Sequence, residues 1–267
     1  MEEDFSKYNG EWTDLRKSQL RMLEILIAVD QICRKHHIPY WLDYGTLLGA
    51  VRHGGFIPWD DDVDISMMKE DYDRFLAIAP KELPEQFVVQ NLSTDKYYSL
   101  TFTKVVDKKS KAIDSTGVYS QSKRKYQGLW IDIFPVIRGN VHLRRWLDRL
   151  YGGCYRRVHH FAPFGIPVLI SYILYPFLWI AKQLMSFFCL FCDKNLRMDD
   201  FGTIEAESKC QKYYDDFIPT KEMMFENKLF FVPNNYDKVL TNYYGDYMKL
   251  PSEDQRVWHL SHVEFFD

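Results

Sequence analysis

Five aspartates crowd into residues 43–64, a stretch that also contains a glycine-rich turn. They are Asp43, Asp60, Asp61, Asp62 and Asp64. Carboxylates gathered in one site raise one another's pKa, so such a cluster needs a strong positive counter-charge. Oxygen ligands suit a hard divalent cation, and Mg²⁺ held by one or two carboxylates is the arrangement of phosphoryl-transfer sites. The pattern therefore predicts a Mg²⁺ (or Mn²⁺) site, with a solvated acidic loop as the alternative.

The residues around the cluster predict how its side chains are oriented. Residues 62–67 alternate polar and apolar, which is typical of a strand, so Asp62 and Asp64 should share one face. Asp60 has the same parity and is a further candidate ligand, whereas Asp61 should point away. Because apolar residues interrupt the charges, the metal site is favoured over the acidic loop.

A second strand is predicted just upstream, over residues 40–44. It ends at Gly45 and Thr46, where a short helix over 47–53 should begin with Thr46 as its cap. A turn from strand to helix of this kind presents free N–H groups to a phosphate. Asp43, on this strand, either orients the site or is simply exposed.

The run over residues 44–64 resembles the LicD/fukutin family, whose domain has the nucleotidyltransferase fold. The resemblance is carried by Tyr-Gly-Thr-Leu-Leu-Gly-Ala-Val-Arg-His and, after a short turn, by Trp-Asp-Asp-Asp-Val-Asp. Further segments that resemble the family lie at 71–75, 128–135, 232–233, 236–240 and 243–248. The resemblance extends over most of residues 15–260 and is weakest at about 140–215.

The resemblance implies transfer of an alcohol phosphate from an activated nucleotide to a sugar hydroxyl. Bacterial members of the family are linked to phosphocholine transfer from CDP-choline onto lipid-linked or cell-surface glycopolymers, such as lipopolysaccharide and teichoic acid. The animal relatives act on pentitol phosphate, so a related CDP-alcohol is the other donor class. Two alternatives stay open: a nucleotidyltransferase that transfers NMP, and a non-catalytic, membrane-associated assembly factor.

The resemblance also implies roles for individual carboxylates. Asp62 and Asp64 would hold Mg²⁺, with Asp60 as an additional ligand. Asp132, flanked by Ile131 and Ile133 in a predicted strand, would be the third carboxylate. It would bind the metal or take the proton of the acceptor.

Three basic residues are candidates to neutralise the diphosphate of the donor. They are Lys104, in a predicted strand over 100–106, and the adjacent Arg52 and His53. A surface or capping role is the alternative for each. Gly45 and Thr46, at the start of the predicted helix, complete the expected phosphate-binding set.

A choline headgroup has no hydrogen-bond donor, so cation–π contacts with aromatic rings are the expected way to hold it. The tryptophans near the acidic motifs are Trp41, Trp59 and Trp130. The chain is 16% aromatic, so core packing is the alternative for these rings.

Composition indicates one catalytic domain over residues 1–267, with a largely helical insertion over 140–215. The chain is 46% hydrophobic, enough to bury a sizeable core, and its net charge of −3 gives no indication of nucleic-acid binding. The expected fold class is α/β (α+β), a mixed sheet with nucleotidyltransferase-like topology. The N-terminus lacks a secretory pattern, and five irregularly spaced cysteines suit a reducing cytosol.

The middle of the chain predicts contact with a membrane. Lys182 is the sole charged residue over 161–192, but prolines at 163, 167 and 176 should interrupt a spanning helix. A helical hairpin lying in one leaflet fits better, at the inner face of the cell membrane. The upstream arginines that could meet anionic lipid are Arg144, Arg145, Arg149, Arg156 and Arg157. The alternative is a pair of ordinary buried helices.

The remaining predictions concern scaffold. Helices are expected over 13–35 and 69–79, and a strand over 87–92. The basic cluster 123–125 is expected in a solvated loop, with contact to substrate as the alternative. Cys189, Cys192 and Cys210 are expected to be buried apolar residues, with a zinc site as the alternative.

Overall fold

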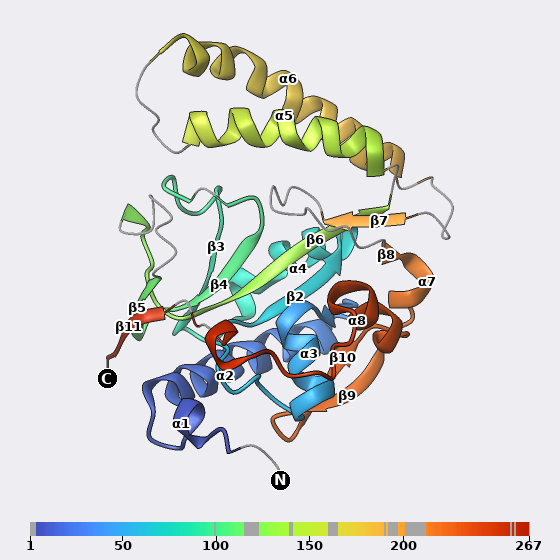
Figure 1. Ribbon diagram of the computed structural model, residues 1–267. Helices are drawn as coiled ribbons and strands as arrows, with labels where there is room; N and C mark the ends of the chain where they lie inside the picture. The colour runs from blue at the N-terminus through green and yellow to red at the C-terminus, as the bar shows by residue number, and fades with distance from the viewer. Residues whose placement is uncertain are drawn as a thin grey trace.

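Helices and strands are mixed along the chain, as the sequence predicts (Figure 1). The computed structural model describes residues 4–98, 100–114, 123–138, 141–159, 165–189, 191, 197–200, 212–256, 258 and 260–266. The helices are α1 (Ser6–Asn9), α2 (Asp14–Lys35), α3 (Tyr44–His53), α4 (Lys69–Glu82), α5 (Val141–His159), α6 (Ile166–Cys189), α7 (Tyr214–Phe217), α8 (Tyr236–Tyr244) and the short 3-10 helix η2 (Glu253–Gln255). The strands are β1 (Trp41–Leu42), β2 (Asp64–Met68), β3 (Phe87–Gln90), β4 (Thr103–Asp107), β5 (Ser110–Asp114), β6 (Trp130–Arg138), β7 (Arg197–Asp200), β8 (Lys212–Tyr213), β9 (Lys221–Phe225), β10 (Lys228–Val232) and β11 (Leu260–Phe265).

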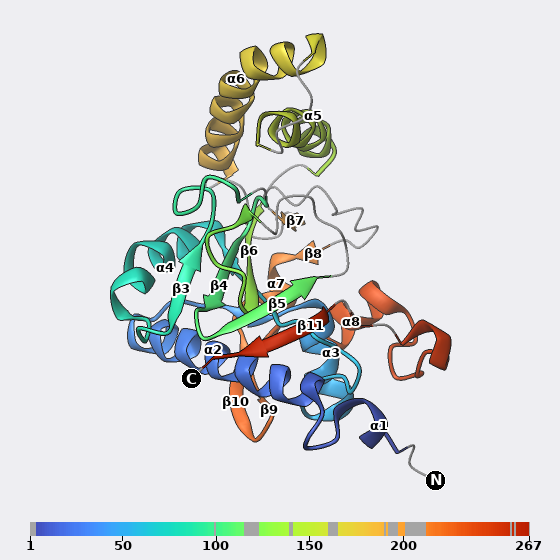
Figure 2. The same ribbon diagram turned by 90° about the vertical axis from the view of Figure 1, so that its left-hand side faces the viewer.

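The central sheet is mixed, with the strand order β1-β2-β6-β4-β3. β2 and β6 run parallel, and the other neighbouring strands along this path run antiparallel. The second half of β6 also pairs with β7, which in turn pairs with β8. Helix α4 covers the face of the sheet opposite to α3 and α8, as Figures 1 and 2 both show. The fold class predicted from the sequence, α/β (α+β) with a mixed sheet, is therefore confirmed.

Helix α2 forms much of the core beneath this sheet. Thr13 caps it by accepting a hydrogen bond from the N–H of Arg16 at 3.1 Å. Its predicted apolar stripe is buried, because Met22, Leu26 and Val29 are at most 1% exposed. Each such side chain contributes about 1.5–3 kcal/mol when it is fully buried.

Helix α3 begins earlier than predicted and has a different cap. Asp43, in an extended conformation, accepts a hydrogen bond from the N–H of Tyr44 at 3.0 Å, so Asp43 rather than Thr46 is the N-cap. The hydroxyl of Thr46 instead accepts from the N–H of Asp64 at 2.8 Å. The prediction of a Thr46 cap was wrong because that hydroxyl holds the start of β2, which lies far away in the sequence.

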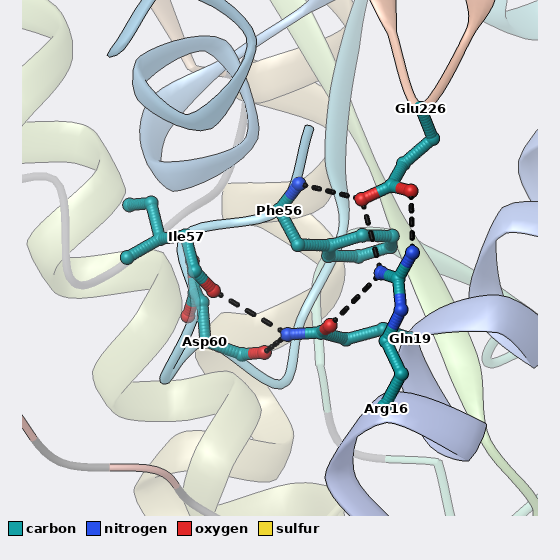
Figure 3. A network of polar contacts seen from close by, with 6 residues as sticks. All are labelled: Arg16, Gln19, Phe56, Ile57, Asp60 and Glu226. Carbon is teal, nitrogen blue, oxygen red and sulfur yellow. Dashed lines mark hydrogen bonds and ion pairs between the residues drawn. The ribbon is translucent and has the colours of Figure 1, made fainter. Parts of the chain in front are cut away.

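A hairpin formed by β9 and β10 reaches the loop that carries Asp60. Glu226 and Asn227, at the tip, both have positive φ, which matches the tight two-residue turns preferred by hairpins. The carboxylate of Glu226 accepts two hydrogen bonds from Arg16, at 3.0 and 2.7 Å, and one from the N–H of Phe56 at 3.2 Å (Figure 3). The turn therefore ties helix α2 to the segment before β2.

Gln19 continues this network to the acidic loop itself. Its side chain is completely buried and donates to the carbonyl oxygen of Asp60 at 2.9 Å (Figure 3). Arg16 donates in turn to the side-chain oxygen of Gln19 at 3.2 Å. The backbone of Asp60 is thus fixed from α2, and its carboxylate is left to face the site.

Glu226→Gln is expected to lower the free energy of unfolding by about 1–3 kcal/mol near neutral pH. Burial raises the pKa of Glu226, but the hydrogen bonds from Arg16 and Phe56 outweigh it and hold that pKa below its ordinary value. A lowered folded-state pKa stabilises the fold above the unfolded-state pKa, and this stability is lost as the pH falls through the folded-state pKa. The difference between wild type and variant should therefore shrink under acid conditions.

Urea unfolding at neutral and at acid pH measures this difference. Glu222→Gln is the matched control, since Glu222 lies on the same hairpin and pairs with Arg34 at 2.7 Å but is far more exposed. The control should change stability by only about 0–1 kcal/mol. Equal losses for the two variants would contradict a specific clamp at Glu226.

The region predicted as a helical insertion contains α5 and α6, which lie together beyond the sheet (Figures 1 and 2). The prediction that Pro176 interrupts the helix was wrong, because α6 is continuous from Ile166 to Cys189. A proline inside a helix removes one backbone donor, and the remaining hydrogen bonds of this long helix carry it past that position. Pro163 lies outside the described residues, as do Cys192, Cys210 and the side chain of Cys189. The zinc alternative therefore falls outside the described part of the chain.

Candidate active site

A row of polar side chains crosses the centre of the sheet. In the observed register, Asp64 on β2 is opposite Asp132 on β6, and Asp132 is opposite Lys104 on β4. The N–H of Asp43 donates to the carbonyl oxygen of Asp64 at 3.0 Å, which extends the row past β1. Residues in register on neighbouring strands point to the same face of a sheet. Four ionisable residues from four segments therefore meet on one face.

Asp60 and Asp62 approach the row from the loop before β2. A Cβ atom placed on Gly45 would lie 2.9 Å from Oδ2 of Asp60 and 3.9 Å from Oδ1 of Asp62. The missing side chain at Gly45 is thus what lets these carboxylates reach the start of α3. Burial and the neighbouring carboxylates raise the pKa of Asp60 and of Asp64 well above the ordinary value. The negative charges of these carboxylates are therefore not balanced by the basic side chains around them.

The chemistry of the acidic cluster fits a hard divalent cation. Its donor atoms are carboxylate oxygens, and Asp60, Asp62 and Asp64 are half-buried, so they remain open to solvent. In the part of the chain that the structure describes, no three His, Cys, Asp or Glu side chains already converge as a ready metal-binding group. The carboxylates repel one another in the absence of a cation. Binding of a divalent ion would therefore require them to move closer together.

Asp132 is paired with Lys104 at the centre of the row. Nζ of Lys104 lies 2.5 Å from Oδ1 of Asp132, and both side chains are largely buried. Burial raises the pKa of Asp132, although Lys104 and Arg124 both act to lower it. The same ammonium group lies 4.2 Å from the ring centre of Trp130 and 5.4 Å from that of Phe102. Two residues predicted to bind substrate, Lys104 and Trp130, are thus in contact beside Asp132.

Arg124 is a functional candidate, although the sequence favoured a solvated position for it over contact with substrate. It belongs to a basic cluster predicted as a solvated loop, yet it is only 7% exposed and its guanidinium lies over the ring of Tyr98 at 5.3 Å. Its Nε has no hydrogen-bond partner in the described structure. The loop is held in place by the N–H of Lys125, which donates to Asp95 at 2.7 Å. For Arg124 the prediction was wrong, because this fixed loop turns the side chain inward toward Asp132.

Asp43 is the centre of a buried hydrogen-bond network. Its carboxylate is completely buried and accepts hydrogen bonds from Ser66 at 2.8 Å, Tyr243 at 3.0 Å and Trp41 at 3.3 Å. Nζ of Lys212 lies 3.3 Å from the same carboxylate. The alternative of an exposed Asp43 was wrong. Tyr243 belongs to a segment that resembles the family, whereas no signal in the sequence singled out Lys212.

Arg52 and His53 tie α3 to the C-terminal segment. Arg52 donates to the carbonyl oxygen of Tyr247 at 2.9 Å and to Nε2 of His53 at 3.0 Å. Burial, and then the charge of Arg52, lower the pKa of His53 to about 4, so this imidazole is neutral near pH 7. The segment held in this way brings Tyr244 toward the cluster, where burial and the carboxylates raise its pKa.

Two of the three tryptophans expected to contact the donor lie in the core instead. Trp41 is completely buried and packs on Phe217, with ring centres 5.2 Å apart. Trp59 is 6% exposed and packs on Phe5 and Tyr8 near the N-terminus. The burial of such large apolar surfaces outweighs their nearness to the acids in sequence. Neither ring is accessible to a ligand.

Asp61 points away from the cluster, as its parity predicts. Its carboxylate accepts a hydrogen bond from the N–H of Leu260 at 2.5 Å. Asp61 thus holds the C-terminal strand rather than contributing to the acidic face.

The chain is similar to a protein of known activity over nearly its whole length. It is 32% identical to the lipopolysaccharide cholinephosphotransferase LicD of Haemophilus influenzae over 263 residues, which cover 92% of this chain and 96% of that protein. This chain belongs to the LicD family. The family model for the nucleotidyltransferase domain of LicD, FKTN and FKRP matches residues 37–151, which contain the whole acidic row.

A second group of relatives matches a much shorter part of the chain. The mouse ribitol 5-phosphate transferase FKRP is 40% identical over 70 residues, which cover 24% of this chain and 13% of that protein. An uncharacterised protein of Rickettsia typhi is 45% identical over 65 residues, 24% of this chain and 21% of its own length. This LicD-family chain thus has relatives that are named for the transfer of phosphocholine and of ribitol 5-phosphate.

Proposed function

We propose that this chain is a Mg²⁺-dependent phosphotransferase that moves phosphocholine, or a related alcohol phosphate, from a CDP-linked donor to a sugar hydroxyl. The observation that carries the proposal is the in-register row of Asp64, Asp132 and Lys104, joined by Asp62. Phosphoryl transfer depends mainly on positioning and on charge stabilisation, and this row offers both. The acceptor would be a lipid-linked or cell-surface glycopolymer precursor, such as that of lipopolysaccharide or teichoic acid.

Asp62 and Asp64 would hold the Mg²⁺, for which Mn²⁺ is the alternative, with Asp132 and Asp60 as further ligands. A bound ion would neutralise charge on the transferring phosphate and on the leaving nucleotide. The fit rests on the oxygen donor set and on the crowding of negative charge that raises the pKa of Asp60 and Asp64.

The protein's own groups would position the substrates and move the proton. Burial raises the pKa of Asp132, which suits this carboxylate to accept the proton of the attacking sugar hydroxyl. Lys104, 2.5 Å away, orients that carboxylate and supplies positive charge for the phosphate oxygens. The first N–H groups of α3, near Gly45 and Thr46, favour negative charge at the same place.

The proposal favours choline as the alcohol of the donor. The relative that aligns over 92% of the chain is named for phosphocholine transfer, whereas the one named for ribitol 5-phosphate aligns over 24%. Trp130 is half-buried beside Asp132 and already contacts the Lys104 ammonium at 4.2 Å from its ring centre. It is the one of the three expected tryptophans whose ring is still partly exposed to a quaternary ammonium group.

The wild-type chain is expected to release CMP from CDP-choline only when Mg²⁺ or Mn²⁺ is present, and to attach the choline label to a glycan acceptor. Donors labelled separately in the cytidine and in the choline distinguish the reaction classes. Chelation of the metal should abolish both signals. CDP-ribitol and CDP-glycerol serve as comparison donors.

Each alternative predicts a different result in this assay. Cytidine label on the acceptor would show NMP transfer and overturn the proposed reaction. Release of CMP from CDP-ribitol or CDP-glycerol, but not from CDP-choline, would identify a different donor for the same proposed reaction. If no CDP-alcohol led to CMP release or to labelled acceptor, the alternative of a non-catalytic assembly factor would be favoured.

A further inference from the structure

Helix α6 buries two of its polar residues, Ser171 and Lys182, and leaves most of its large apolar residues exposed. The residues that face the rest of the protein recur every three or four positions and are Val168, Ser171, Tyr175, Leu178, Lys182 and Met185. The outward surface is almost wholly apolar, and its large exposed side chains are Ile166, Leu169, Ile170, Tyr172, Ile173, Leu174, Phe177, Trp179, Ile180, Leu184, Phe187 and Phe188. A helix in water shows the opposite pattern.

Contacts with α5 fix this orientation. Lys182 is 3% exposed, and its ammonium lies 4.4 Å from the ring centre of Tyr151 on α5. Tyr151 also stacks on Tyr175 of α6, with ring centres 5.5 Å apart. Tyr155 of α5 donates to the carbonyl oxygen of Leu100 at 3.0 Å, which ties the pair to the catalytic domain. A rotation of α6 about its axis would break these contacts and expose the buried Lys182.

The exposed apolar surface of α6 requires an apolar environment that covers a large area. The exposed side chains recur at positions around most of α6, which lies beside α5 (Figures 1 and 2). Residues 166–185 are long and apolar enough to cross a membrane, and only 17% of the most apolar window is buried. A patch of this extent is far above what a soluble surface normally carries. A surface that wraps around a helix matches a lipid phase better than a single flat protein interface.

The topology of the sheet argues against a crossing. The chain leaves the sheet at the end of β6 and returns at β7, which pairs with β6 through Arg138 and Met198. Both ends of the helical pair are therefore on the same side. A crossing by α6 would need α5 to cross back, and the sequence of α5 is rich in arginine, with Arg144, Arg145, Arg149, Arg156 and Arg157.

We propose that α5 and α6 form a hairpin that docks in one leaflet of an anionic bilayer. In this arrangement α6 enters the acyl region through its outer face, and the arginine-rich sequence of α5 meets anionic headgroups. Trp179 and Tyr172, both on the exposed face, suit the boundary between headgroups and acyl chains. Docking of this kind would bring the catalytic sheet, which continues directly into α5, to lipid-linked acceptors.

Flotation of the full-length protein with vesicles of phosphatidylcholine and phosphatidylglycerol tests the proposal. The wild type should float with these vesicles, and less well with pure phosphatidylcholine or at high salt. The double variant Ile173→Glu/Phe177→Glu should lose on the order of 100-fold in vesicle partitioning. Both side chains are more than half exposed, at 58% and 67%, so the fold should be retained.

Trp12→Glu is the matched control, since Trp12 is 81% exposed and comes between α1 and α2 in the sequence. Helix α1 lies at the opposite end of the molecule from α5 and α6 (Figure 1). It should float as the wild type does. In the wild type, brominated lipids should quench fluorescence, and Trp179→Phe should lose part of that quenching. Neither readout depends on donor or metal, so failure of the proposed reaction would leave this test intact.

Two outcomes would overturn the proposal. One is equal flotation of the wild type and the Ile173→Glu/Phe177→Glu variant. The other is a wild type that stays in the supernatant and forms a dimer that the double variant abolishes, which would identify a second copy as the occupant of this face.

Discussion

Asp64→Asn is expected to reduce metal-dependent CMP release by on the order of 10³-fold or more. Asp64 lies in register with Asp132, so its carboxylate is central among the groups proposed to hold the cation. Asparagine keeps the shape and one oxygen but removes the charge that a divalent ion requires. The hydrogen bond from its N–H to Thr46 involves the backbone and should survive the substitution.

The same variant should be as stable as the wild type, or more stable, when no metal is present. Burial and neighbouring carboxylates raise the pKa of Asp64, which means that its charged form destabilises the folded state at neutral pH. Removing that charge relieves the repulsion. Thermal unfolding with a chelator present, together with CMP release in Mg²⁺, measures both effects in one pair of proteins.

Asp61→Asn is the matched control for this result. Asp61 comes from the same segment, but its carboxylate accepts from Leu260 and faces away from the cluster. It should retain most of the activity. Equal loss of CMP release in the two variants would contradict a specific role for the Asp64 carboxylate.

Asp43→Ala is expected to lower the free energy of unfolding by about 3–5 kcal/mol, because it leaves buried Lys212 without its carboxylate. The hydroxyl groups of Ser66 and Tyr243 would also lose their acceptor. A loss of this size corresponds to a fall in Tm of roughly 10 °C for a chain of this length. Differential scanning calorimetry and urea unfolding measure it directly.

The companion variant Lys212→Met separates the ion pair from the rest of the network. Combined with Asp43→Ala, it should cost less than the sum of the two single changes, since no unpaired charge then remains buried. Strict additivity would contradict direct coupling between Asp43 and Lys212. Asp43→Asn should give an intermediate loss, because the amide oxygen still accepts hydrogen bonds.

Local patterns in the sequence were sufficient for much of the fold and for the acidic face. The alternation over residues 62–67 predicted the strand that begins at Asp64, although Asp62 lies just before it in the loop. Helix α2 follows its apolar spacing from its Thr13 cap. These features depend on neighbours a few residues apart. The family resemblance added Asp132, and the membership that it implied is confirmed by a relative that aligns over 92% of the chain.

Contacts between segments that lie far apart in the chain could not be predicted from local sequence patterns. Lys212 meets Asp43 across 169 positions, and Tyr243 meets it across 200. Arg124 is turned inward by a loop that Asp95 anchors, so its basic neighbours gave a misleading indication of exposure. Trp41 lies near the acids in sequence, but its packing on Phe217 is decided by tertiary structure.

The pairing of β6 with β7 brings the two ends of the segment between these strands next to each other. Arg138 and Met198 face each other on adjacent antiparallel strands, which a turn of about 2–5 residues ordinarily connects. The register of β6 with β7 is set by the two strands themselves. The strands can therefore pair whatever the length of the segment that connects them. A different insertion joined at this junction would leave the row of Asp43, Asp64, Asp132 and Lys104 unchanged, because all four residues lie outside it.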